Sequence, residues 1–269
     1  MRVALGQFEI EAGTVDRNVD RAVEVIAEAA VDDADLVALP ELFDVGYFAF
    51  DSYPQAAEPL DGPTLSRISR AASRHGLAVL AGSVVEDLAA SRASGFETPA
   101  DNGYANAAVL FGRDGTRRAV YRKHHLFGYG SAEQELLTPG ESLPTVAFEG
   151  FTVGVTTCYD LRFPELYRRL VDAGATLVLV PSAWPYPRVE HWRLFPQTRA
   201  VENLVYVAAV NGLGEFDNAT LLGRSAVYDP WGTTLAGAGD DPGLVVADLD
   251  PDRVADRRAE FPALEDRRH

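Results

Sequence analysis

The sequence predicts an α/β protein in which strands and helices pack in layers. Three observations indicate this class. Apolar strand-like runs alternate with amphipathic helical segments along most of the chain. The 269 residues are enough to bury a sizeable core. The composition, 47% hydrophobic and 24% charged, is that of an ordinary globular protein. The order of the elements is compatible with one mixed sheet or with two sheets.

The N-terminal half alternates strands with two predicted helices. Apolar residues at helical spacing predict the first helix over 18–30. The second is predicted over 63–75, with Gly76 as its stop. The turn Arg113-Asp114-Gly115 predicts a hairpin between two strands, whereas residues 86–103 have no clear period and are expected to form a loop or excursion. We expect strands over 2–8, 35–40, 77–85, 104–112 and 116–123.

The C-terminal half continues the alternation. Residues 124–143 contain glycine, proline and acids and are expected to form a long loop. Helices are predicted over 164–173, where proline suits the first turn, and over 189–203. From about residue 252 we expect a charged, partly helical tail. No linker or repeat divides the chain, so a single domain over 1–269 is expected. Strands are predicted within 145–157 and over 176–181, 204–211, 225–228 and 244–248.

The chain is acidic and has a single cysteine. Its 40 acidic and 24 basic residues give a formal net charge of −16. This charge argues against nucleic acid and anionic membranes as partners, because their phosphates would repel it. The one cysteine, Cys158, excludes an intramolecular disulfide and a site built from several thiolates. The basic residues are all arginine except Lys123.

No segment has the features of a signal peptide or a membrane span, so we expect a soluble cytoplasmic protein. Two explanations of the composition stay open. The excess of acids fits a proteome adapted to high salt, in which charge keeps proteins apart. Alternatively, codon bias has replaced lysine by arginine.

Three reactive side chains are expected at strand ends. Cys158 follows an apolar strand and precedes a helix, a position whose field favours the thiolate. Glu41 ends the run LVALPE, and Lys123 ends TRRAVYRK. A cysteine nucleophile needs a base for its proton and a donor for the oxyanion, which Glu and Lys can supply. Each also has an ordinary explanation: a buried inert thiol, a solvated loop acid and a lysine that survived by chance.

A papain-like pairing of cysteine with histidine is the rival arrangement. Turnover that survives Lys123→Ala would favour it over the Glu, Lys and Cys set. A non-catalytic binding or scaffold protein is a further alternative, against which the presence of all three side chains argues. The available histidines are His75, His124, His125, His191 and His269.

Several segments together resemble the nitrilase superfamily of carbon–nitrogen hydrolases. The resemblance extends from residue 2 to about 250, with the motifs in family order. It is carried by Pro40-Glu41-Leu42-Phe43, by YRKHHLF over 121–127 and by CYDLRFPE over 158–165, and continues through His191-Trp192, RAVEN over 199–203, Gly223-Arg224-Ser225 and DPWG over 229–232.

The resemblance implies a catalytic triad of Glu41, Lys123 and Cys158. It also implies a second glutamate shortly before Pro139-Gly140, for which Glu133 is the match and Glu135 the alternative. The family fold is a four-layer α-β-β-α sandwich, and family members pair through the helices outside the sheets. A homodimer or larger homo-oligomer is therefore expected. No metal or organic cofactor is expected, since neither metal-ligand nor phosphate-loop motifs occur.

The residues after the nucleophile point to an amidase branch. Nitrile-cleaving members typically place Trp-Glu after the cysteine, whereas this chain has Tyr159-Asp160. The resemblance implies a small amide substrate cleaved through a thioester, with the Tyr159 backbone N–H and Lys123 on the oxyanion. N-carbamoyl hydrolase, nitrilase and acyltransferase activities stay open as alternatives. The residues expected to line the pocket or hold a substrate carboxylate are Tyr47, Tyr159, Arg162, Trp184 and Arg188.

Overall fold

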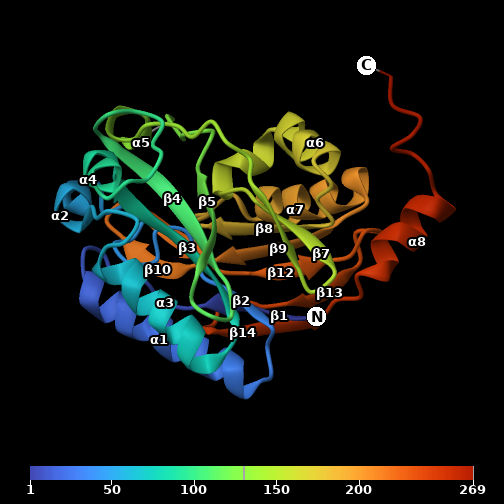
Figure 1. The fold of residues 1–269 in the computed structure, drawn as a ribbon, viewed down its shortest axis with the longest axis horizontal. Coiled ribbons are helices and arrows are strands. Elements are labelled where there is room, and N and C mark those ends of the chain that lie inside the picture. The colour runs from blue at the N-terminus through green and yellow to red at the C-terminus, as the bar shows by residue number, and fades with distance from the viewer. Residues whose placement is uncertain (130, 269) are drawn as a thin grey trace.

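The computed structural model describes residues 1–129 and 131–268, and its strands form two large sheets (Figure 1). In spatial order, the first sheet contains β14 (Gly243–Asp248), β1 (Arg2–Gln7), β2 (Leu36–Ala38), β3 (Ala78–Asp87), β4 (Tyr104–Phe111) and β5 (Arg117–Arg122). The second contains β13 (Thr234–Gly237), β12 (Ala226–Tyr228), β9 (Tyr206–Asn211), β8 (Leu177–Ser182), β7 (Phe151–Val155) and β6 (Thr145–Phe148). A separate hairpin joins β10 (Leu213–Phe216) to β11 (Ala219–Leu222).

Helices cover the outer face of each sheet. The first sheet packs against α1 (Val15–Val31) and α3 (Pro63–His75), and the second against α6 (Pro164–Asp172) and α7 (Val189–Asn203) (Figure 1). Shorter helices are α2 (Tyr53–Ala56), α4 (Leu88–Ala93), α5 (Glu133–Leu136) and α8 (Asp252–Glu260), with 3-10 turns at Phe50–Ser52 and Cys158–Arg162. The layers follow the order α-β-β-α, so the expected four-layer sandwich is confirmed.

The alternation of side chains along each strand explains how both faces of a sheet are buried. On β1, Val3 and Leu5 pack between the two sheets, whereas Ala4 faces α1 and α3. Since successive strand residues point to opposite faces, a strand covered on both faces needs a continuous apolar run. The inner cluster joins β1 and β2 to residues such as Val153 and Leu177 of the second sheet.

The predicted helices agree closely with the structure where end signals are strong. Helix α3 begins at Pro63 and ends before Gly76, which has the left-handed φ of 67° that glycine adopts freely. Helix α7 has the predicted bounds, but the following strand begins at Tyr206 rather than 204. Leu204 ends α7 in a left-handed conformation, with φ of 49°, and so cannot extend the strand.

Two predicted loops and several unassigned segments contain regular structure. The expected loop over 86–103 begins with the last residues of β3 and then forms α4, whose first turn is capped by the Asp87 carboxylate accepting from the Ala90 N–H at 3.0 Å. The expected loop over 124–143 contains α5. The strands β10, β11 and β13 were not predicted, because each has four residues and none shows the alternation of a half-buried strand. In the described part of the chain, no helix is long and apolar enough to span a membrane.

The two sheets bring several strand ends to one place. Strands β2 and β3 are parallel, as are β7, β8 and β9. The segment after β2 crosses to the second sheet, where the Glu41 N–H donates to the Ser182 carbonyl at the end of β8. Carboxyl ends of parallel strands meet at one sheet edge. The three reactive residues predicted at strand ends therefore converge.

Candidate active site

Lys123 lies between two buried carboxylates. Its Nζ donates to Glu41 Oε1 at 2.8 Å and to both oxygens of Glu133 at 2.9 and 3.0 Å. The side chains of all three residues are fully shielded from solvent. Burial opposes the charged form of Lys123, but the charges of Glu133 and Glu41 outweigh it and hold the lysine pKa well above its usual value. The lysine therefore stays an ammonium.

Glu41 is held in one orientation by groups from both sheets. Its Oε1 accepts from Asn106 Nδ2 on β4 at 2.9 Å, and its Oε2 accepts from the backbone N–H of Ala183 at 2.9 Å. Burial raises the pKa of Glu41 above its usual range, while the charge of Lys123 acts in the opposite direction. A carboxylate with a raised pKa and fixed geometry is suited to general acid–base work.

Of the two candidates for the second glutamate, Glu133 is the one that contacts Lys123. Glu133 is buried and also accepts from the Phe127 N–H at 2.6 Å and the Tyr47 hydroxyl at 3.0 Å. Glu135 lies on the same short helix but is exposed. The alternative assignment is therefore not supported, because only one of the two carboxylates reaches Lys123.

Cys158 begins the 3-10 turn after β7 with a left-handed backbone, at φ of 46°. Such a conformation is strained for any residue but glycine and is typical of functional turns. The thiol is buried, and its polar neighbours are the Glu41 carboxylate, the Ala183 N–H and the Lys123 ammonium. The turn therefore presents the sulfur to all three groups.

The expectation of a stabilised thiolate was wrong, because the pKa of Cys158 is raised and not lowered. Burial raises the pKa of Cys158 well above its usual value, and the charge of Glu41 raises it further, whereas Lys123 lowers it. Removal from water and a neighbouring anion outweigh the ammonium and the turn. Cys158 is therefore a neutral thiol that needs a base to become a nucleophile.

Three of the described histidines, His124, His125 and His191, have partners other than the thiol. His125 Nδ1 lies 2.8 Å from Asp160, and His191 Nδ1 lies 3.1 Å from Arg162. His124 Nδ1 faces the Arg122 carbonyl at 3.2 Å. His75 lies at the end of α3, and His269 lies outside the described residues. Among residues 1–129 and 131–268, no histidine hydrogen-bonds to Cys158, which disfavours the papain-like pairing.

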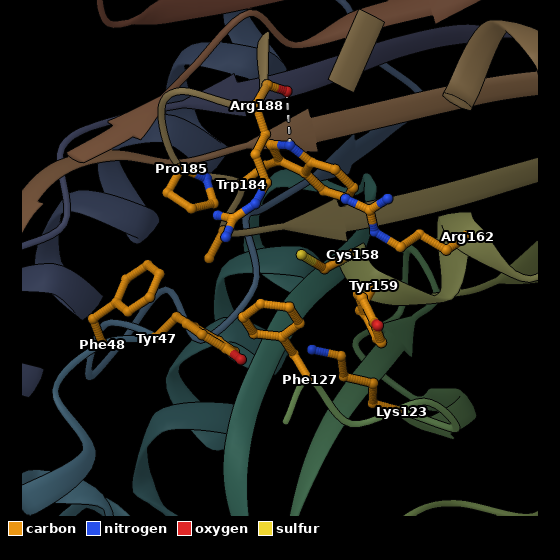
Figure 2. Close-up of a pocket in the computed structure, with 11 residues that line it drawn as sticks. Tyr47, Phe48, Lys123, Phe127, Cys158, Tyr159, Arg162, Trp184, Pro185 and Arg188 are labelled. Carbon is orange, nitrogen blue, oxygen red and sulfur yellow. Dashed lines mark hydrogen bonds between the residues drawn. The ribbon is translucent and has the colours of Figure 1, made fainter. Parts of the chain in front are cut away.

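A small pocket opens above Cys158 (Figure 2). All five residues predicted for substrate binding line it. Residues 44–55 and 182–190 contribute to its lining, whereas residues 86–103 contribute none of it. The lining is Tyr47, Phe48, Lys123, Phe127, Cys158, Tyr159, Arg162, Ala183, Trp184, Pro185 and Arg188.

Two arginines meet at this pocket without an acidic partner among the described ion pairs. The Arg162 guanidinium lies 5.3 Å from the Trp184 ring centre and 5.0 Å from that of Phe195. The Arg188 guanidinium lies 5.6 Å from the ring centre of Phe127. In Figure 2 the two guanidinium groups lie on either side of the Cys158 sulfur. Within the described chain, no group of three His, Cys, Asp or Glu side chains could hold a metal ion.

Sequence reasoning did not identify Asn106 or the Ala183 amide as parts of the site. Asn106 donates to Glu41 at 2.9 Å and to Glu133 at 3.3 Å. A weak signal was available, because Asn106 is a polar residue inside the apolar strand run YANAAVLF. A backbone N–H has no sequence signal, so the role of Ala183 required the fold.

Comparison with known proteins finds similar sequences that match this chain over most of its length. Residues 2–259 match the family model described as carbon–nitrogen hydrolase. The chain is 34% identical over 276 residues to the omega-amidase NIT2 of Homo sapiens, covering 99% of this chain and 95% of that protein. It is 34% identical over 244 residues to the 2-oxoglutaramate amidase of Paenarthrobacter nicotinovorans, covering 89% and 80%.

The fold is also similar to solved structures. One is a mutant of the amidase from Nesterenkonia sp. AN1 that shows Michael addition of acrylamide at the active-site cysteine. The similarity has a TM-score of 0.81 at 30% identity and covers 98% of this chain and 99% of the other. The likeness therefore extends over nearly the whole chain in both sequence and fold.

Proposed function

Because this chain belongs to the carbon–nitrogen hydrolase family, as its match over residues 2–259 establishes, we propose that it hydrolyses the amide bond of a small carboxylate-bearing substrate. The observation that carries the proposal is the charge of the pocket. In a chain of net charge −16, the lining contains Arg162 and Arg188, which have no acidic partner among the described ion pairs, and no acid is among its described lining residues. A cationic pocket in an anionic protein selects an anion. The named activities of the relatives, which are amidases, support the same reaction.

The first half-reaction forms a thioester on Cys158. Glu41 accepts the thiol proton as the sulfur attacks the amide carbon, so that the C–S bond forms while the carbonyl electrons move to oxygen. The Lys123 ammonium and the Tyr159 backbone N–H stabilise this oxyanion. When the oxyanion collapses, the C–N bond breaks and the proton on Glu41 passes to the nitrogen, which leaves as ammonia.

The second half-reaction returns the enzyme to its first state. Glu41 accepts a proton from water, whose oxygen attacks the thioester carbon and forms a second oxyanion at the same donors. Collapse breaks the C–S bond and releases the carboxylic acid product. The proton on Glu41 returns to sulfur. Glu133 takes no proton in this scheme: it orients Lys123 and helps keep it charged.

A screen for ammonia release tests the reaction. Small monoamides of dicarboxylic acids should release ammonia, whereas nitriles and N-carbamoyl compounds should release much less. Cys158→Ala should abolish release while leaving the far-ultraviolet circular dichroism unchanged. Lys123→Ala should also abolish release, but at a cost in stability, because Glu41 and Glu133 lose their buried counter-charge. Turnover retained in either variant would contradict the assignment. Product analysis in the presence of an added amine separates hydrolysis from acyl transfer, since only transfer consumes the amine.

The substrate carboxylate can be tested separately from the chemistry. Arg162→Met and Arg188→Met should raise KM for a carboxylate-bearing amide by about tenfold or more, because a charged hydrogen-bond partner is lost. An amide of the same length that ends in methyl provides the control, and its kcat/KM should change little. Equal losses for both amides would mean that these arginines shape the pocket rather than hold an anion.

We also propose that the chain forms a homodimer or larger homo-oligomer through the helices outside the sheets. On α7, the apolar residues Leu194 and Val201 are 58% and 44% exposed. Exposed apolar residues on one helix favour association. Light scattering coupled to size exclusion would report the mass, and Leu194→Glu with Val201→Glu should lower it. A monomeric wild-type protein would contradict the proposal.

A further inference from the structure

Asp160 is a fully buried carboxylate that accepts hydrogen bonds from two separate segments. From the segment around β5, the Tyr121 hydroxyl donates to Oδ2 at 2.5 Å, and His125 donates to Oδ1 through its backbone N–H at 3.0 Å and through Nδ1 at 2.8 Å. From the segment after β7, the Thr157 N–H donates to Oδ2 at 3.0 Å. Because a carboxylate only accepts, Nδ1 of His125 must carry the proton.

These donors adjoin the catalytic residues on both sides. Tyr121 and His125 lie two residues before and two residues after Lys123, and Thr157 directly precedes Cys158. Lys123 and Cys158 come from different sheets, so no regular strand pairing sets the distance between them. Asp160 therefore connects the backbone that carries the ammonium to the backbone that carries the nucleophile.

We propose that Asp160 is a positioning residue that sets the Lys123 ammonium relative to the Cys158 sulfur and holds Cys158 in its left-handed conformation. The inference rests on the proposed function. Catalysis requires the attacking sulfur and the oxyanion donor to be placed to within a fraction of an ångström, and small displacements are costly. Asp160 touches neither substrate nor reacting atoms in this scheme and acts through the two segments it joins.

The backbone N–H groups that donate to residue 160 require a carboxylate at that position. Each oxygen of Asp160 faces at least one backbone N–H, from His125 or from Thr157. An asparagine at this position would direct its NH₂ group against one of these N–H groups in either orientation. Since Asp160→Asn can therefore prevent folding, the decisive test removes side-chain donors to Asp160.

Tyr121→Phe and Tyr167→Phe form a matched pair. Both tyrosines are fully buried, and each hydroxyl makes one side-chain hydrogen bond, to Asp160 at 2.5 Å or to Thr156 at 2.7 Å. Tyr121→Phe should lower kcat by about tenfold with KM nearly unchanged, since orientation rather than binding is lost. Tyr167→Phe should change kcat less than about twofold. Equal effects of the two substitutions would overturn the proposal.

Substitution of His125 supplies a rescue experiment. The side-chain nitrogen of asparagine can take the place of Nδ1, whereas leucine offers no donor. Both substitutions remove the stacking of His125 on Phe163, whose ring centres are 3.6 Å apart. His125→Asn should therefore keep most of the kcat that His125→Leu loses. Equal kcat in these two variants would also overturn the proposal.

The rate of alkylation by iodoacetamide measures the reactivity of the Cys158 thiol without a substrate. Cys158 is the sole cysteine, so the rate reports one thiol. The rate should fall in Tyr121→Phe but not in Tyr167→Phe, because Lys123 favours the thiolate only when correctly placed. A wild-type enzyme that releases no ammonia from any amide would refute the proposed function. The alkylation comparison would still decide the role of Asp160.

Discussion

Replacing Glu133 by glutamine should destabilise the protein by about 3 kcal/mol. The carboxylate lies 2.9 Å from Lys123 Nζ, and at an effective dielectric constant of about 20 that attraction is about 6 kcal/mol. The ammonium lies 2.8 Å from Glu41, so the nearest oxygens of the two glutamates are at most about 5.7 Å apart and repel by about 3 kcal/mol. The difference matches the usual cost of breaking a buried ion pair.

Denaturant unfolding at neutral pH measures this loss. Protein concentration must be held constant, because any subunit association would contribute to the apparent stability. Glu135→Gln is the control: this glutamate lies on the same helix, is exposed, and should change the unfolding free energy by less than about 0.5 kcal/mol. If Glu133→Gln were no less stable than Glu135→Gln, the ion-pair reasoning would be refuted.

Glu133→Gln should also shift the dependence of kcat/KM on pH. Burial is the main cause of the raised pKa of Glu41, and the charge of Glu133 adds to it. Without that charge the pKa of Glu41 falls, so the acid limb of kcat/KM against pH should move to lower pH. The maximal kcat should also fall, because Lys123 loses the group that orients it. An acid limb that moved to higher pH would contradict this account.

Three other outcomes are expected. Asn106→Ala should lower kcat by about tenfold in the ammonia assay, since Glu41 and Glu133 both lose a donor; unchanged kcat would contradict the role. Burial raises the pKa of Asp44 to about 7, and within the described residues its carboxylate has no hydrogen-bond partner. The Asp44 carboxyl therefore ionises at lower pH in the unfolded chain than in the folded protein, so the free energy of unfolding falls as pH rises from about 4 to 7. Asp44→Asn should be more stable than wild type at pH 8 but not at pH 3. Finally, adaptation to salt predicts a Tm that rises in multimolar KCl, whereas codon bias predicts no rise.

The sequence alone determined the fold class, most element positions and the three reactive residues. These are properties of contiguous residues. Pro63 and Gly76 mark both ends of α3 within the chain itself. The scarcity of lysine made Lys123 conspicuous, and the single cysteine left one candidate thiol. Short elements such as α4 and β13 were not predicted, because so few residues do not show a hydrophobic period that distinguishes them from loops.

Only the tertiary structure decided how the site works. It placed Glu133 and not Glu135 against Lys123, because burial depends on how α5 packs and not on its sequence. It reversed the expected direction of the Cys158 pKa shift, because burial of the thiol and the nearby charge of Glu41 arise only when the two sheets meet. It also brought Asn106 and Asp160 to the site. Local sequence encodes where strands and helices form, whereas burial and hydrogen-bond partners depend on residues far apart in the chain.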